Sequence, residues 1–282
     1  MILIADAGGT KIEWALIDSD GTTLMRTTTR GHNAAHADTQ TLVYMLHAEA
    51  PTLYAEAQDV DEIFYYGAGC AGERKVTVAK TLSEIFHAGT CHAESDMLGA
   101  AQALCGRNEG IACILGTGSN SCHYDGIKIT ANVSPLGFIL GDEGSGAVLG
   151  RRLIGMVFKR GFSKDICDKF QWRFPEDSIN RIITSVYRGE RPNAYLASFV
   201  PFLAENIDDN EISDFVTDEF IRFFRFNISA YSQAKSLPIH FTGSVAYYFQ
   251  KQLNIAAQTL GYTVGNIQKS PMEALIAFHG GK

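Results

Sequence analysis

Short apolar runs, bounded by glycine and aspartate turns, predict an alternation of strands and helices along the chain. We expect strands at residues 2–5, 12–17, 22–30, 63–66, 90–93, 111–115, 120–124, 238–242 and 262–264. Helical spacing of apolar residues predicts helices over residues 38–49, 73–86, 96–104, 148–157, 244–260 and 270–279. The segment 163–235 is expected to be helical throughout, with breaks at residues 174–175, 189–192 and 208–210. The predicted order over the first 90 residues is therefore β-β-β-α-β-α.

Two local details accompany these elements. Residues 31–36 are expected to form a loop, because glycine, histidine, asparagine and alanine follow the third strand there. Ser270 and Glu273 are expected to form a capping box at the start of the last helix, with Pro271 in the first helical position.

The beginning of the chain has a counterpart near its middle. A strand, a glycine turn, a returning strand and an Asp-Gly turn occupy residues 2–21, and the same succession occupies residues 111–126. An internal repeat of this length predicts two halves of one topology. We therefore expect an α/β fold of two domains whose glycine turns face each other across a cleft. The predicted domains are residues 1–101 with 269–282, and residues 102–268 with the helical segment as an insert.

Composition narrows the classes of function. The net charge of the 282 residues is 24 − 31 = −7 and no basic block is present, which disfavours a nucleic-acid partner but allows a small anionic ligand that carries its own metal. The six cysteines are scattered without a Cys-x-x-Cys pair, as expected for reduced thiols in a cytoplasmic protein. No apolar run approaches the ~20 residues that span a bilayer. No basic region precedes the first apolar run, so we expect neither a signal peptide nor a membrane partner.

The two glycine turns are candidates for phosphate binding. Paired glycines permit a positive φ and let a large anion approach the backbone. The residues expected to bind a nucleotide are Gly8, Gly9, Thr10 and Lys11 in the first turn, and Gly116, Thr117, Gly118 and Ser119 in the second. The alternative is a pair of ordinary hairpin turns. Neither turn matches the Gly-x-x-x-x-Gly-Lys-[Ser/Thr] P-loop.

Two aspartates could complete a site for phosphoryl transfer, which requires a metal anchor and a base. Asp6 ends the first strand and is expected to hold Mg²⁺ through water. Its alternative role is to cap its own turn through the amide of Gly8 or Gly9. Asp96 begins a predicted helix and is expected to be the base, although Asp at that place is also an ordinary N-cap. The two roles are compatible, because a helix N-terminus keeps a carboxylate ionised.

An acceptor pocket would need polar groups and an aromatic face. Asn33 and Asp142 can bind sugar hydroxyls, and Phe138, in a turn with Gly137, can pack on a pyranose ring. Asp96 and Thr117 are expected to contact the same sugar. The alternatives are a loop Asn, a turn Asp and a core Phe. Gly243 and Ser244, between the strand at 238–242 and a helix, are expected to lie against adenosine, or else to cap that helix.

Five motifs together resemble the N-acetylglucosamine kinase family. They occupy residues 6–11, 94–101, 115–120, 141–145 and 241–245, in the order found in that family. The family lies in the BadF/BadG/BcrA/BcrD-type branch of the actin/hexokinase/Hsp70 superfamily, which also holds the activator ATPases of benzoyl-CoA reductase and 2-hydroxyacyl-CoA dehydratase. The resemblance implies two ribonuclease-H-like domains around a nucleotide cleft and phosphorylation of a sugar 6-hydroxyl with ATP and Mg²⁺. It places Asp96 at the catalytic position and Ser270 among the nucleotide-binding positions.

The sequence departs from the family at the expected sugar pocket. Ala34 and Ala35 follow Asn33 where animal members have a tryptophan, and Phe138 stands where they have another. Both departures touch the side of the pocket that reads the sugar and its N-acetyl group, so the sequence supports a hexose or amino-sugar kinase more strongly than N-acetylglucosamine itself. The expected acceptor is an amino sugar, N-acetylglucosamine or a close relative, and we expect a homodimer. Two other functions remain open: an ATPase that drives a partner enzyme, and a sugar sensor without catalysis.

Overall fold

The computed structural model describes residues 1–34 and 38–281. The chain forms two compact units: the first comprises residues 1–112, 124–130 and 270–282, and the second comprises residues 113–123 and 131–269. The predicted loop at residues 31–36 is described only as far as Ala34, because Ala35 and His36 lie outside the described residues.

Strands and helices alternate as the apolar pattern predicts. The strands are β1 (Ile2–Ala7), β2 (Lys11–Ile17), β3 (Thr23–Arg30), β4 (Glu62–Gly67), β5 (Thr90–Ser95), β6 (Gly110–Leu115), β7 (Ser119–Tyr124), β8 (Ile129–Val133), β9 (Ile239–Thr242) and β10 (Val264–Gln268). The helices are α1 (Thr39–Glu49), α2 (Pro51–Glu56), α3 (Glu73–Phe86), α4 (Asp96–Cys105), α5 (Gly137–Leu140), α6 (Gly146–Phe158), α7 (Lys164–Arg173), α8 (Ile179–Arg188), α9 (Pro192–Ala197), α10 (Val200–Glu205), α11 (Asn210–Phe226), α12 (Ser244–Tyr248), α13 (Gln250–Thr259) and α14 (Met272–Gly280).

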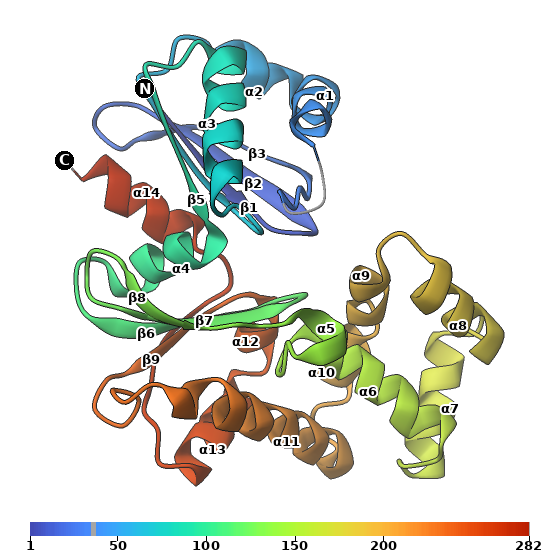
Figure 1. Ribbon diagram of the computed structural model, residues 1–282. Helices are drawn as coiled ribbons and strands as arrows, with labels where there is room; N and C mark the ends of the chain where they lie inside the picture. The colour runs from blue at the N-terminus through green and yellow to red at the C-terminus, as the bar shows by residue number, and fades with distance from the viewer. Residues whose placement is uncertain (35–37, 282) are drawn as a thin grey trace. The chain divides into compact units, whose positions relative to one another are not determined.

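The first sheet has the strand order β3-β2-β1-β4-β5. Strand β1 is antiparallel to β2 and parallel to β4, so the sheet is mixed. Alternate residues of β1 point to opposite faces: Leu3 and Ala5 join a core with α1, α2 and α3, whereas Ile2 and Ile4 join a core with α4 and α14. Figure 1 shows these helices on the two faces of the sheet. The sheet is thus covered on both sides, and the loops at its edge remain available for a site.

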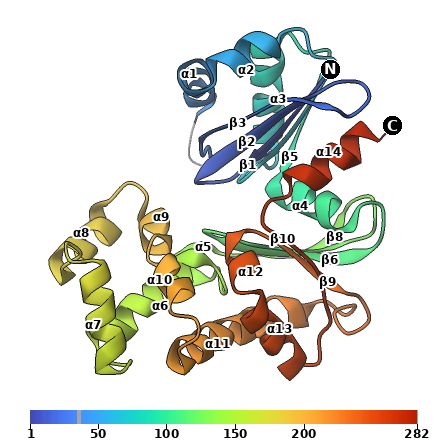
Figure 2. The same cartoon turned by 180° about the vertical axis from the view of Figure 1, so that it is seen from behind.

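The second sheet has the order β10-β9-β6-β7-β8. Read from β8 to β10, it repeats the order of the first sheet: β8, β7, β6, β9 and β10 take the places of β3, β2, β1, β4 and β5. This agreement confirms the repeat and the predicted α/β fold of two similar halves. Helices α11 and α13 pack side by side in the second unit (Figure 2). The aromatic face of α11 contacts the sheet, because the rings of Phe223 and Phe224 lie 6.2 and 6.0 Å from that of Phe241 in β9.

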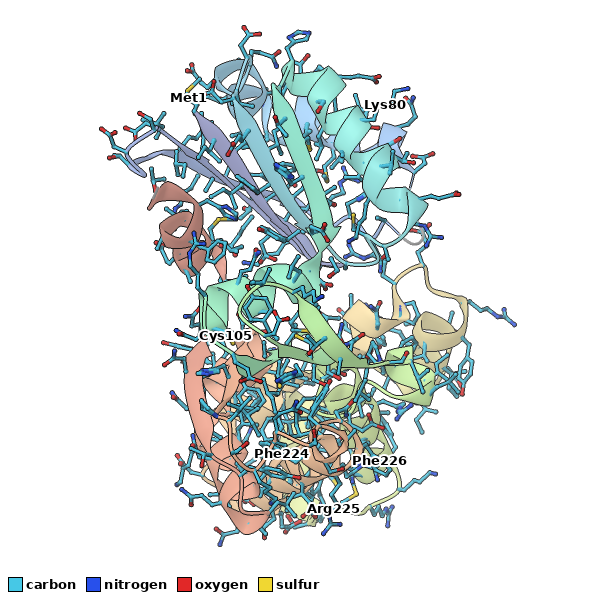
Figure 3. The ribbon with its side chains drawn as sticks, turned by 60° about the vertical axis from the view of Figure 1, so that its left-hand side comes forward. Met1, Lys80, Cys105, Phe224, Arg225 and Phe226 are labelled. Atoms are coloured by element: carbon cyan, nitrogen blue, oxygen red, sulfur yellow. The ribbon has the colours of Figure 1, made fainter. Side chains whose placement is uncertain are left out.

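The end of α11 shows how strictly the helix separates core from solvent. Phe224 is fully buried, whereas Arg225 and Phe226 are exposed, and the three consecutive side chains are labelled in Figure 3. The helical segment was predicted to extend to residue 235, but α11 ends at Phe226 and is followed by one turn of 3₁₀-helix (Ile228–Ala230). Its predicted breaks are present between α7 and α8, α8 and α9, and α10 and α11, with a further break before Val200.

Three local predictions are wrong. The short helix α2, which begins at Pro51, adds a second helix before β4. The single helix expected over 244–260 is interrupted at Phe249. Instead of forming a capping box, Glu273 pairs with Arg26 of β3, and the Ser270 hydroxyl donates to Glu13 at 2.5 Å and accepts the Met272 amide at 3.3 Å. No helix among the described residues is long and apolar enough to cross a membrane.

Candidate active site

The first glycine turn is a tight hairpin between β1 and β2. The amide of Gly8 donates to the carbonyl of Lys11 at 3.0 Å, so it is not capped by the Asp6 side chain. Neither Gly8 nor Gly9 adopts a positive φ, which corrects the expected reason for glycine at these positions. At Gly9 a Cβ would meet no atom within 4 Å. The packing of the protein itself therefore does not require glycine at position 9. Because Gly9 has no side chain, space remains beside its backbone.

Asp6, at the end of β1, lies in an acidic environment within the first unit. Burial, then the nearby charges of Asp96 and Glu13, raise the pKa of Asp6 to about 7, and Lys11 opposes them. The ammonium of Lys11 lies 3.2 Å from the carboxylate of Glu13. A carboxylate held near other carboxylates is stabilised by a cation. The structure therefore brings Asp6 and Asp96 together, as expected of a metal anchor and a base in one site.

Asp96 is the first residue of α4, but it is not the residue that caps the helix. Ser95 has the extended cap conformation, and its hydroxyl accepts the amide of Leu98 at 3.3 Å. The Asp96 carboxylate accepts the amide of Met97 at 2.9 Å. Burial raises the pKa of Asp96 to about 6, against the smaller lowering by that amide. The helix N-terminus was expected to keep Asp96 ionised, but its effect on the pKa is smaller than that of burial. The carboxylate still ionises below neutral pH.

Asn33 lies in the loop after β3, which is fixed to the first turn. The amide of Gly31 donates to the carbonyl of Thr10 at 2.9 Å, and the amide of Ala34 donates to the carbonyl of Ala68 at 3.0 Å. A Cβ on Gly31 would lie 2.4 Å from the backbone of Gly9. Only glycine at 31 permits this approach, so the candidate sugar residue and the candidate phosphate turn belong to one rigid arrangement.

The second glycine turn, in the second unit, is held by the start of α6. The amides of Gly146 and Ala147 donate to the carbonyls of Gly116 and Thr117 at 2.8 and 3.0 Å. A Cβ at Gly116 would meet nothing within 4 Å, and Gly116 has no positive φ. Gly116 therefore repeats the behaviour of Gly9: it is a glycine that neither backbone conformation nor packing explains.

Asp142 lies against this second turn. A Cβ on Gly118 would lie 3.3 Å from the Asp142 carboxylate, which also accepts the amide of Ser119. Burial, and to a smaller extent Glu143, raise the pKa of Asp142 to about 6. Asp142 has a φ of 54°, in the left-handed region that side-chain-bearing residues seldom adopt. Such strained positions cluster at functional sites.

Gly137 and Phe138 form the short helix α5, which closes back on Asp142. The amide of Gly141 donates to the carbonyl of Gly137 at 2.8 Å, and that of Asp142 to the carbonyl of Pro135 at 2.9 Å. Arg151 of α6 donates to the carbonyl of Phe138 at 2.7 Å. The backbone of the candidate sugar loop is therefore fixed, while the Phe138 side chain is only half-buried.

Gly243 connects β9 to α12 with a φ of 116°. A Cβ there would lie 2.3 Å from the carbonyl of Leu115, so glycine is required for this turn to approach the second glycine turn. Gly243 occupies the cap position without a side chain, and the exposed Ser244 is the first helical residue. The second unit thus assembles the turn at 116–119, Asp142 and Gly243 in one region.

Two acidic residues near these turns had no assigned role in the sequence prediction. Glu13 contributes to the charge around Asp6 and accepts the Ser270 hydroxyl. Glu219 is fully buried in α11, where it pairs with Arg152 and accepts the amide of Gly144 at 3.2 Å. A carboxylate among the phenylalanines of α11 was the signal that could have indicated Glu219. Among the described residues, no group of three or more His, Cys, Asp or Glu side chains is arranged to hold a metal by itself.

Comparisons with known proteins agree with this architecture. The profile of the BadF/BadG/BcrA/BcrD ATPase family matches residues 5–272. A candidate N-acetylglucosamine kinase from Porphyromonas gingivalis is 42% identical, with a TM-score of 0.95 over 100% of this chain and 99% of its own. No curated protein matches the chain.

Two more distant structures share the fold. A candidate N-acetylglucosamine kinase from Chromobacterium violaceum is 18% identical, with a TM-score of 0.72 and 98% of both chains covered. A ROK family glucokinase from Streptomyces griseus, solved with glucose and AMPPNP, is 13% identical, with a TM-score of 0.56 over 98% of this chain and 97% of its own.

Proposed function

Because the chain belongs to the BadF/BadG/BcrA/BcrD ATPase family, we propose that it is an ATP-dependent kinase for the 6-hydroxyl of an amino sugar. The acceptor proposed is N-acetylglucosamine or a close relative. The similar protein from Porphyromonas gingivalis, itself a candidate N-acetylglucosamine kinase, supports this choice at 42% identity over the full chain.

The observation that carries the proposal is the behaviour of Gly9 and Gly116. Gly9 is the second residue after β1 and Gly116 is the first residue after β6, and at each a Cβ would meet nothing within 4 Å. Neither has a positive φ. In a turn between two strands, such a glycine leaves the backbone open to a ligand that approaches it closely. Phosphate oxygens bound by backbone N–H groups are such a ligand.

Asp96 would act as the base in the proposed reaction. Its carboxylate removes the proton from the sugar 6-hydroxyl, and the freed oxygen attacks the γ-phosphorus of ATP in line with the bond to ADP. The raised pKa of about 6 suits this task, because the group is ionised at neutral pH yet basic enough to accept a proton. The proton remains on Asp96 until solvent removes it.

Asp6 would hold Mg²⁺ through water, since Mg²⁺ retains most of its waters and binds few carboxylates. The raised pKa of Asp6, beside Asp96 and Glu13, fits a site that a divalent cation stabilises. When bound, the ion supplies charge neutralisation at the phosphate oxygens. Thr10, Lys11, Thr117, Ser119, Gly243 and Ser244, with the glycines of both turns, would bind the nucleotide.

Three side chains are proposed to contact the sugar. Asn33 and Asp142 would bind its hydroxyls, and Phe138 would pack against the ring. Asp142 is suited to accept a hydroxyl proton in a hydrogen bond, because the Ser119 amide already holds its carboxylate in place. Thr117 would contact the sugar at the junction with the phosphate.

The test is a screen for ADP release with glucose, glucosamine, N-acetylglucosamine, N-acetylmuramic acid and N-acetylmannosamine. Asp96→Asn should lower kcat by more than about 100-fold, the range of one catalytic base, while ATP and sugar still bind. In the wild type, kcat/KM should fall about tenfold for each pH unit below about 6, as Asp96 becomes protonated. Near-normal turnover by Asp96→Asn would show that another group is the base.

The same screen separates the proposal from the other function known in the branch, an ATPase that drives a partner enzyme. ADP release that no sugar increases would favour that function.

A further inference from the structure

The loop that carries Asn33 contains a buried histidine with two hydrogen-bond partners. His32 is only 2% exposed, although it lies between the end of β3 and the start of α1. Its Nε2 lies 3.1 Å from the carbonyl oxygen of Asp38, and its Nδ1 lies 3.3 Å from the hydroxyl of Tyr65. Both ring nitrogens are therefore engaged in the interior of the first unit.

The partners fix the direction of these bonds. A carbonyl can only accept, so Nε2 of His32 carries the proton that it donates to Asp38. In the tautomer with this single ring proton, Nδ1 accepts the proton of the Tyr65 hydroxyl. Asp38 is itself held as the N-cap of α1, because its carboxylate accepts the Thr41 amide at 2.9 Å. The chain of bonds thus runs from β4 through His32 to the start of α1.

Tyr65 lies in the interior of the first unit. Its side chain is fully buried, and this burial is the main cause of its raised pKa, to which the charges of Cys70, Asp96 and Asp6 add. Its ring lies so close to Gly67 that a Cβ there would be 2.4 Å away. The hydroxyl that His32 accepts from is therefore fixed at the carboxyl end of β4.

Backbone hydrogen bonds hold the loop on either side of His32. Gly31 bonds to Thr10 of the first glycine turn, and Ala34 bonds to Ala68 after β4. These two bonds fix the backbone on either side of His32, and the bond between His32 and Tyr65 ties a side chain of the loop to β4.

We propose that His32 and Tyr65 are positioning residues that hold Asn33 in place for the sugar. The inference rests on the proposed function, since it assigns the pair to the sugar-binding step of that reaction. The pair does not contact the reacting atoms. It acts by preventing the loop from rotating out of its bound position, a cost that sugar binding would otherwise meet.

The experiment compares four variants in steady-state kinetics, with the sugar that the screen identifies. Tyr65→Phe removes only the hydroxyl, and His32→Leu removes both ring nitrogens. Tyr65→Phe should raise the KM for the sugar about tenfold, the size of one lost hydrogen bond, and His32→Leu, which loses two, should raise it at least as much. Both should leave the KM for ATP within about twofold. His32→Gln should stay within about threefold of the wild type, because a side-chain amide can donate to Asp38 and accept from Tyr65.

Tyr66→Phe is the matched control. Tyr66 is the next residue of β4, and its hydroxyl bonds to Gln102 and His279 on the other face of the sheet. Tyr66→Phe should lower the stability about as much as Tyr65→Phe, but the KM for the sugar should stay unchanged. If the effect of Tyr65→Phe on KM were only a loss of stability, both tyrosine variants would show it equally. Thermal unfolding of each variant measures its loss of stability directly.

The outcomes are distinct. A sugar KM in Tyr65→Phe no higher than in Tyr66→Phe would overturn the positioning role and leave the kinase proposal intact. The same conclusion would follow if His32→Gln behaved like His32→Leu. Should His32→Leu fail to fold, Tyr65→Phe and His32→Gln still decide the question. A wild-type protein that phosphorylates no sugar would instead overturn the proposed function, and the sugar role of the pair with it.

Discussion

Replacing Asp6 by Asn should stabilise the protein, increasingly so as the pH rises. Burial and the neighbouring carboxylates raise the pKa of Asp6 from 3.8 to about 7. A group whose pKa is raised by folding contributes stability below its unfolded value and loses it as pH rises through its folded value. At pH 8 the wild type therefore bears the cost of an ionised, crowded carboxylate, whereas Asn cannot ionise.

The magnitude follows from the pKa difference. At about 1.4 kcal/mol for each pKa unit, a rise from 3.8 to about 7 sets an upper limit of about 4 kcal/mol at high pH. Part of the Asp6 side chain reaches solvent, which screens its interactions, so we expect about half of that limit. Between pH 5 and pH 8 the stability difference between variant and wild type should widen by about 1–2 kcal/mol.

The assay is urea unfolding at pH 5 and pH 8, with divalent cations removed by a chelator. The comparison between pH values cancels any pH-independent effect of the substitution. Asp125→Asn is the control: amides of Lys128 and Ile127 lower the pKa of this exposed turn residue, so its contribution is lost only in acid. Its difference from the wild type should be the same at both pH values. A constant or narrowing difference for Asp6→Asn would refute the acidic environment inferred for Asp6.

Two further predictions concern packing. Glu219→Gln should lower the free energy of unfolding by about 2–3 kcal/mol, because it weakens the pair with Arg152 at a buried carboxylate. The exposed Glu205→Gln, measured by the same urea titration, should change it by less than about 0.5 kcal/mol, and equal effects would contradict the burial argument. Tyr66→Phe should cost about 1–2 kcal/mol, since its hydroxyl bonds to Gln102 at 2.6 Å and to His279 at 2.8 Å. An unchanged thermal midpoint would show that these bonds contribute nothing net.

The sequence predicted most strands and helices because those depend on neighbouring residues. The continuous apolar run of β1 and the helical spacing of apolar residues in α3 are both local patterns. The repeat of strand, glycine turn and strand likewise follows from the chain alone, and both sheets have the same strand order. The helix at α2 was missed because it is only six residues long and lies within one short connection.

The candidate residues were found by type and place, but their chemistry depends on distant partners. The Asp96 position was recognised in the sequence, yet the cap of α4 is Ser95, and burial sets the pKa of Asp96. The expected positive φ is absent at Gly8 and Gly9, since the turn closes in a conformation open to any residue. No local pattern could show that a Cβ at Gly9 would meet nothing within 4 Å.

By itself, the sequence determined the order of most elements and the repeat, and it supplied the candidate residues for phosphate and sugar binding. These properties arise from periodicity and turn preferences over a few neighbouring positions. Only the tertiary structure decided that Asp6 lies near Asp96, that Gly118 lies against Asp142, and that Glu219 holds Gly144. Each of these depends on residues far apart in the chain, and on burial, which changes the energy of a charge only once the surrounding core has formed.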